Sequence, residues 1–151
     1  MRVFDTAADL VPFVGEDLGA SDWLFVDQGM IDSFAQLTGD HQWIHVDVAR
    51  AARDRPDGRT IAHGFLVASL IPRLAVYRVD RYAYGLNYGL NRVRFIGPVP
   101  AGSHIRLRVR LGGCEAIEGG YRVTNNCLVE VEGRERGALV ADTIAIFYDP
   151  E

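Results

Sequence analysis

The segment IAHGFLVASLIPRLAVY, residues 61–77, is the most informative part of the sequence for the fold class. It is apolar on nearly every side and too short to cross a bilayer, so we expect a helix buried inside the domain. Pro72 should bend this helix or mark its last turns, because proline lacks the N–H that a helix interior needs. A helix that is buried all round requires a sheet to cover it.

The chain after this helix changes to an alternating pattern with a period of two residues. In IRLRVRL the aliphatic side chains face one way, and Arg106, Arg108 and Arg110 face the other. Turns rich in glycine and proline separate segments of this kind, which predicts an antiparallel meander wrapped around the helix. The expected strands are residues 82–89, 90–97, 103–113, 121–133 and 138–149. The fold class is therefore α+β.

The chain before residue 61 predicts shorter elements. Residues 21–26 read as a strand, after which Asp27 can cap a helix over residues 28–38 that Gly39 ends. We also expect short helices at residues 6–14, where Thr6 and Asp9 form a capping box, and at residues 46–53. No linker or internal repeat divides the sequence, so residues 1–151 are interpreted as one domain.

Composition excludes several classes of protein. The net charge of −4 and pI near 5.5, without a basic stretch, argue against nucleic acid as a partner. All 16 basic residues are arginine, which excludes a lysine Schiff base. Cys114 and Cys127 lack the spacing of a zinc or redox motif and are expected to be small buried hydrophobes. The N-terminus lacks the pattern of a secretion signal and no segment is long enough to span a membrane, so we expect a cytoplasmic protein.

The segment FAQLTGDHQWIHVDVARA, residues 34–51, resembles the hydratase signature of the MaoC-like dehydratases and (R)-specific enoyl-CoA hydratases. That signature has an aromatic residue, Gly-Asp, Asn-Pro, an aliphatic residue, His, Asp and a small residue. IAHGFLVASL and the later RFIGPVPAGSHIRLRVRL also match the family's pattern, so the resemblance runs from about residue 20 onward. One departure is that Gln42 and Trp43 replace Asn-Pro.

The resemblance implies a hot-dog fold and the hydration of a trans-2-enoyl-CoA thioester. This reaction needs a water molecule between two groups that exchange protons, and hydrogen-bond donors for the charge that develops on the thioester oxygen. Asp40 and His45 match the family's acid–base pair. A zinc site formed by Asp40, His41, His45 and His63 is the competing interpretation, because these side chains are also metal ligands. The resemblance implies no metal and no redox cofactor.

The family also suggests residues that bind the substrate. The backbone N–H of Gly64, at the start of the central helix, matches the amide that faces the thioester oxygen, and His63 is expected to orient this turn. Gln42 stands in the place of the family's Asn, while Ser69 matches a serine near the active site of some relatives. A hydroxyl on a helix often bonds back to the preceding turn instead.

Arginines are the candidates for binding the phosphates of CoA, since guanidinium groups pair well with phosphate oxygens. Arg92 and Arg94, with Arg73 and Arg81, are the residues considered, although arginines on the outer face of a sheet are usually only solvated. We expect a homodimer, because an open sheet leaves an edge strand that a second copy can cover. A hot-dog thioesterase and a non-catalytic acyl-binding subunit are the alternative functions.

Overall fold

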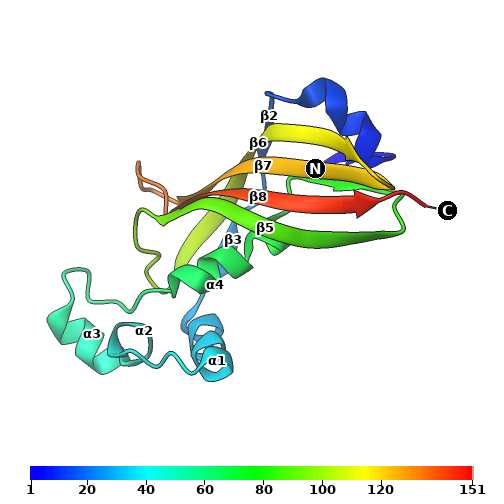
Figure 1. Cartoon of the computed structure of the whole chain (residues 1–151). Coiled ribbons are helices and arrows are strands. Elements are labelled where there is room, and N and C mark those ends of the chain that lie inside the picture. The colour runs from blue at the N-terminus through cyan, green and yellow to red at the C-terminus, as the bar shows by residue number, and fades with distance from the viewer. Residues whose placement is uncertain (151) are drawn as a thin grey trace.

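The computed structural model describes residues 1–150, in which a curved antiparallel sheet covers a short helix (Figure 1). The helices are the 3₁₀ helix η1 (Ala7–Phe13), α1 (Gln28–Thr38), α2 (Trp43–Val46), α3 (Val48–Asp54), α4 (Gly64–Ser69) and the 3₁₀ helix η2 (Ile71–Leu74). The strands are β1 (Arg2–Phe4), β2 (Asp17–Ala20), β3 (Leu24–Val26), β4 (Tyr77–Val79), β5 (Tyr84–Phe95), β6 (Ser103–Ile117), β7 (Gly120–Val131) and β8 (Leu139–Tyr148).

The main sheet has the order β2-β6-β7-β8-β5, and β3 also pairs with β6. All of these pairings are antiparallel, as the alternating pattern predicts. The two strands expected at residues 82–89 and 90–97 are instead one strand, β5, whose register against β8 shifts at two places. These bulges accommodate a longer strand than the sequence pattern suggests. A separate parallel pair joins β1 to β4.

The helix expected over residues 61–77 is wrong in its extent. Ile61 forms an antiparallel bridge with Pro100, and His63 has extended backbone angles, so the helix begins at Gly64. The α-helix ends at Ser69, and Pro72 lies in the 3₁₀ turn η2 that follows. Tyr77 already belongs to β4. The helix is also not buried on every side, because Phe65 is 72% exposed.

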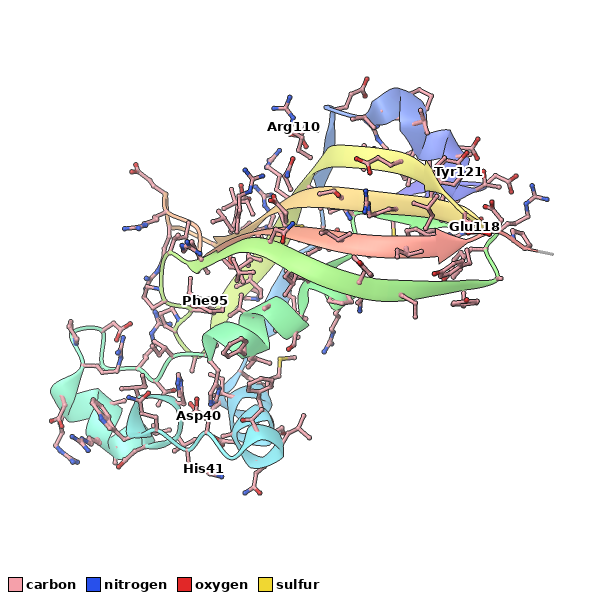
Figure 2. All side chains as sticks on the ribbon, viewed as in Figure 1. Asp40, His41, Phe95, Arg110, Glu118 and Tyr121 are labelled. Atoms are coloured by element: carbon pink, nitrogen blue, oxygen red, sulfur yellow. The ribbon has the colours of Figure 1, made fainter. Side chains whose placement is uncertain are left out.

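The core lies between α4 and the concave face of the sheet. Leu66 and Val67 of α4 and the aliphatic side chains of IRLRVRL are buried there. Cys127 is buried in this core as expected, whereas Cys114 is only half-buried. Arg110 points away from the sheet, as the alternation of β6 predicts (Figure 2).

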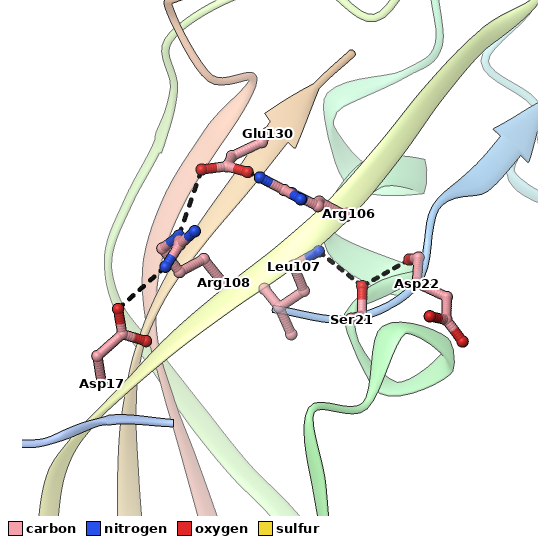
Figure 3. Close-up of polar contacts among 7 residues, drawn as sticks. All are labelled: Asp17, Ser21, Asp22, Arg106, Leu107, Arg108 and Glu130. Carbon is pink, nitrogen blue, oxygen red and sulfur yellow. Dashed lines mark hydrogen bonds and ion pairs between the residues drawn. The ribbon is translucent and has the colours of Figure 1, made fainter. Parts of the chain in front are cut away.

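Ion pairs tie three strands together on the outer face of the sheet (Figure 3). Glu130 of β7 accepts hydrogen bonds from Arg106 at 2.5 Å and from Arg108 at 3.4 Å, and Arg108 also pairs with Asp17 of β2 at 3.0 Å. Arg106 and Arg108 therefore join β6 to its neighbouring strands. Exposed pairs of this kind contribute little to stability, but they favour this pairing of the strands.

Helices α1 to α3 form a separate layer on the side of α4 that faces away from the sheet (Figure 1). Asp27 caps α1 by accepting a hydrogen bond from the N–H of Met30, and Gly39 ends the helix in the left-handed region at φ 77°, as predicted. The short helix expected over residues 46–53 is confirmed as α3, which Asp47 caps by accepting a hydrogen bond from the N–H of Arg50, and the one-turn helix α2 precedes it. No helix within residues 1–150 has both the length and the apolar character needed to span a membrane.

The capping box between Thr6 and Asp9 is present as predicted, and the helix that it starts is the 3₁₀ helix η1. Pro12 lies inside it. The strand expected at residues 21–26 is shorter, since only Leu24–Val26 pair with β6. These differences lie away from the site described next.

Candidate active site

Asp40, His45 and His63 come together in the layer between α1 and α4. Each residue has one atom that can bind a metal ion or exchange a proton, and these three atoms lie within 4.8 Å of one another. Asp40 is exposed on the loop after α1, where Figure 2 shows it beside His41, and the two histidine rings are buried. His41 is exposed and not a member of this group. His45 lies within the short helix α2.

The ring of His45 is held in one orientation by the backbone. Its Nδ1 lies 2.7 Å from the carbonyl oxygen of Ile61, which can only accept, so Nδ1 carries the hydrogen. Nε2 of the neutral ring is then a free acceptor. The side-chain amide of Gln28 donates to the backbone oxygen of His45 at 2.8 Å, and the hydroxyl of Thr60 in turn donates to Gln28. Two segments far apart in sequence thus fix the position of this histidine.

His63 links the Asp40 loop to the start of α4. Its Nε2 donates to the backbone oxygen of Asp40 at 2.9 Å, and its ring stacks on that of His45 with centroids 3.8 Å apart. The ring of Phe34 also contacts the ring of His63, at a centroid distance of 5.1 Å. His63 is 2% exposed, and its Nδ1 has no hydrogen-bond partner among residues 1–150. These contacts hold the Asp40 turn against α4.

Burial lowers the pKa of His45, because the charged ring would lose its hydration. The hydrogen bond to the oxygen of Ile61 opposes this shift, and the neighbouring His63 adds to it. The imidazole is therefore neutral at pH 7, with Nε2 able to accept a proton.

We expect acid to destabilise the protein through His45. Its pKa in the folded state lies below the unfolded value of about 6.5, so the unfolded state binds more protons as the pH falls through that window. The free energy of unfolding should therefore decrease below about pH 6.5. Urea denaturation at pH 7.5 and at pH 5.5 measures this decrease, which should be smaller in His45→Gln. Equal decreases in the two proteins would contradict the assignment.

The three groups can hold either a water molecule or a metal ion. Each histidine is oriented by a backbone carbonyl, as metal-binding histidines commonly are, and the carboxylate supplies an oxygen ligand. Three protein ligands and one water also make a common catalytic zinc site. The geometry is compatible with both alternatives, and a chelator distinguishes them.

A small cavity of about 310 Å³ opens beside His45 and is also lined by Gly64 and Phe95. Gly64 is the first residue of α4, where backbone N–H groups have no partner within the helix. A Cβ atom at Gly64 would lie 2.8 Å from the ring of Phe95, so glycine is needed for this close packing. The free amide of Gly64 and the buried ring of His45 thus share one cavity.

A large cavity of about 930 Å³ lies further along α4, between this helix, η2 and the strands β5 to β8. Phe65 lines the large cavity and Phe95 the small one, and the two rings contact each other at a centroid distance of 5.7 Å. Ser69 also lines the large cavity, but it is exposed and its hydroxyl donates back to the oxygen of Phe65 at 2.7 Å. Ser69 therefore does not join Asp40 and His45.

Arg92, Arg94 and Gln42, the remaining candidates for binding the substrate, each make contacts of their own. Arg92 has φ 51° at a bulge of β5, and its guanidinium pairs with Asp142 at 2.5 Å. Arg94 donates to the backbone oxygen of Val93. The register shift between Asn91 and Arg94 also breaks the regular alternation that would place both arginines on one face. Gln42 is exposed and caps α2 only through its backbone.

Sequence reasoning missed Gln28, Thr60 and Phe95. Gln28 and Thr60 form the hydrogen-bonded pair that holds the backbone of His45, which we call the clamp, and Phe95 packs against Gly64. A glutamine at the start of a helix and a phenylalanine at the end of a strand are common in any protein, so no local pattern marks them. Their roles depend on contacts between distant segments.

Comparison with known proteins adds to this geometry. The family profile described as "MaoC like domain" matches residues 9–132. 3-Hydroxyacyl-thioester dehydratase Z of Mycobacterium tuberculosis is 48% identical over 147 residues, which cover 95% of this chain and 97% of that protein. Nodulation protein N of Rhizobium leguminosarum bv. viciae is 45% identical over 148 residues, with coverage of 95% and 92%.

A solved structure shows the same fold. R-hydratase PhaJ1 from Pseudomonas aeruginosa superposes with a TM-score of 0.76, covering 97% of this chain and 88% of that chain at 21% identity. The expected hot-dog architecture is thereby confirmed. The family profile and the two relatives span nearly the whole sequence. The chain therefore belongs to the MaoC-like dehydratase family and is an enzyme with the hot-dog fold.

Proposed function

We propose that this protein hydrates trans-2-enoyl-CoA thioesters reversibly to (R)-3-hydroxyacyl-CoA. The observation that carries the proposal is the convergence of Asp40 and a neutral His45 near the small cavity that the start of α4 also lines. The related mycobacterial protein is named for dehydration of a 3-hydroxyacyl thioester, which is the same reaction in reverse.

The two side chains are suited to holding one water molecule. The carboxylate of Asp40 and Nε2 of His45 are both acceptors, and water offers two hydrogens. When the water oxygen bonds to C3 of the substrate, one of these groups takes its proton, and C2 receives a proton from the same pair of groups. Between the addition at C3 and the protonation of C2, the electron pair of the double bond moves toward the thioester carbonyl. Either residue can act as the formal base in this scheme.

The amide of Gly64 is proposed to donate to the thioester oxygen as that oxygen becomes negative. Support comes from its place in the small cavity with His45, and from the absence of a helical partner for this N–H. A donor aimed at developing charge in a water-poor cavity stabilises the transition state more than the ground state. His63 is proposed to position the Asp40 loop through its hydrogen bond to the Asp40 oxygen.

The large cavity is proposed to receive the acyl chain. Its walls are mostly apolar, and the contacting rings of Phe65 and Phe95 lie between it and the small cavity. Each buried methylene group contributes about 0.8 kcal/mol to binding. A thioester at the start of α4 and a tail between helix and sheet would occupy the two cavities together.

Crotonyl-CoA tests this function against its alternatives. Hydration removes the absorbance of the conjugated enoyl group without releasing a thiol, whereas a thioesterase releases free CoA. A non-catalytic acyl-binding protein does neither. The product should be oxidised only by a dehydrogenase specific for (R)-3-hydroxyacyl-CoA. Turnover should persist after treatment with a strong chelator, and loss of activity that zinc restores would favour the metal site instead.

We predict a homodimer that pairs through β5, as an extension of the same proposal. β5 is an edge strand, and its side chains Tyr84, Leu86, Tyr88, Leu90 and Phe95 are all more than 40% exposed. Light scattering at micromolar concentration should give twice the mass of the chain, and Tyr88→Lys should shift this toward the monomer. Phe25→Lys, at the opposite edge of the sheet, should not. A monomeric unmodified protein would refute the prediction.

A further inference from the structure

The large cavity contains polar side chains where the sheet pattern calls for apolar ones. Asn125 of β7 alternates with the buried Val123 and Cys127, so it lies on the concave face. Thr143 of β8 lies on the same face, two positions beyond the buried Ala141. Both residues line the large cavity together with Tyr77. We call Tyr77, Asn125 and Thr143 the polar floor.

The contacts within the polar floor leave some of its hydrogen-bonding groups available. The hydroxyl of Tyr77 donates to Oδ1 of Asn125 at 3.1 Å, and this uses the amide oxygen. The amide nitrogen of Asn125 reaches Oγ1 of Thr143 only at 3.5 Å, the outer limit for such a bond. Within residues 1–150, the other side-chain contact of Oγ1 is the sulfur of Cys127 at 3.8 Å, so the second amide hydrogen of Asn125 and the hydroxyl hydrogen of Thr143 are available to a ligand. These donors can bind an oxygen acceptor.

The protonation state of this group is fixed at physiological pH. Burial raises the pKa of Tyr77 to about 12, so the phenol keeps its hydrogen at physiological pH and can donate it to Oδ1 of Asn125. Donors that stay half-buried without partners are costly, at about 1–3 kcal/mol each, unless a ligand or water satisfies them. A pocket that binds only an unsubstituted hydrocarbon chain would not need these hydrogen-bond donors.

The polar floor lies well beyond the reacting carbons. Phe95, which packs on Gly64, pairs with Leu139 across β5 and β8. Thr143 is four residues further along β8, which corresponds to about 13 Å of strand. An acyl chain whose thioester lies at Gly64 would therefore meet the floor at a carbon far from the double bond.

We propose that this enzyme selects acyl thioesters that carry an oxygen atom, as a hydroxyl or carbonyl group, on the distal part of the acyl chain. This inference rests on the proposed function, because it takes the large cavity as the acyl site. Asn125 and Thr143 are the specificity-determining residues, and Tyr77 positions the amide of Asn125. The substituent accepts hydrogen bonds that a hydrocarbon tail leaves unmade.

The test compares 10-hydroxy-trans-2-decenoyl-CoA with trans-2-decenoyl-CoA. The ratio of their kcat/KM values within each protein cancels any general loss of activity. We expect the unmodified enzyme to favour the hydroxylated substrate by about 10-fold or more, the equivalent of one or two hydrogen bonds. Thr143→Val, which keeps the shape of the side chain, and Asn125→Leu should each lower the ratio toward one. Thr124→Val, on the opposite face of β7 from Asn125, should leave it unchanged.

Two failures can be told apart in this experiment. If the unmodified enzyme hydrates neither decenoyl substrate nor crotonyl-CoA, the proposed function is wrong. If it hydrates them but shows no preference for the hydroxylated chain, the inference about the polar floor is overturned while the proposed function stands. A preference that survives in both Thr143→Val and Asn125→Leu also overturns the assignment.

Discussion

Asp40→Asn and His45→Gln should each reduce the turnover of crotonyl-CoA by about 10²- to 10⁴-fold, the usual contribution of a positioned acid or base. Both substitutions keep the size of the side chain. Asparagine can still accept the hydrogen bond that Oδ1 takes from the N–H of Gln42, but it cannot take up a proton. Glutamine lacks the titrating ring. The measurement is the steady-state loss of enoyl absorbance with saturating substrate.

The combined variant separates one shared step from two independent ones. If both groups act on one water, the double variant should be scarcely slower than either single variant, because the second change removes a function already lost. Independent roles would instead multiply the two losses. His41→Gln is the matched control, since this exposed neighbour lies outside the group and its replacement should leave turnover unchanged. Near-normal activity in either single variant would refute the acid–base assignment.

Gly64→Pro should reduce turnover by about 10²- to 10³-fold, because it deletes the N–H proposed to face the thioester oxygen. The backbone tolerates this change, since proline is favoured at the first position of a helix. His63 has φ −60° and ψ 139°, the extended conformation that a residue before proline prefers. A folded variant is therefore expected, and circular dichroism tests that expectation.

Gly64→Ala is the control for the added bulk. It places the same Cβ atom about 2.8 Å from the ring of Phe95 but retains the N–H. Phe95 is 47% exposed and can move aside, so alanine should cost much less activity than proline. The ratio between the two variants measures the contribution of the amide. Equal activities of the proline and alanine variants would show that Gly64 serves packing and not the oxyanion.

The sequence predicts those parts of the structure whose causes are local. Asp27 and Gly39 mark the ends of α1, and the alternation in IRLRVRL gives the inward and outward faces of β6 correctly. The sequence between Gly39 and His45 likewise brings Asp40 and His45 together, because a left-handed glycine and a short helix turn the chain back on itself. Each of these features depends on residues only a few positions apart.

Other features depend on contacts that no local pattern reveals. The central helix is shorter than its apolar sequence suggests, because Ile61 pairs with the distant Pro100 in an antiparallel bridge and His63 is extended. The N-terminal strand β2 pairs with β6 across a wide sequence separation. The clamp of Gln28 and Thr60 on His45 joins three separate segments. Pairings of this kind depend on contacts between distant segments of the folded chain, which a local sequence pattern does not contain.

The side chains proposed for catalysis and the walls of the large cavity come from different parts of the chain. Residues 28–63 supply Asp40, His45, His63 and the clamp, whereas the large cavity is lined only from Phe65 onward. For an engineer this separation is useful, because a mutant library confined to the walls of the proposed acyl cavity changes the tail specificity while the proposed acid–base groups keep their supports. Gene duplicates could diverge in the same way, each retaining one chemistry while specialising in a different metabolite.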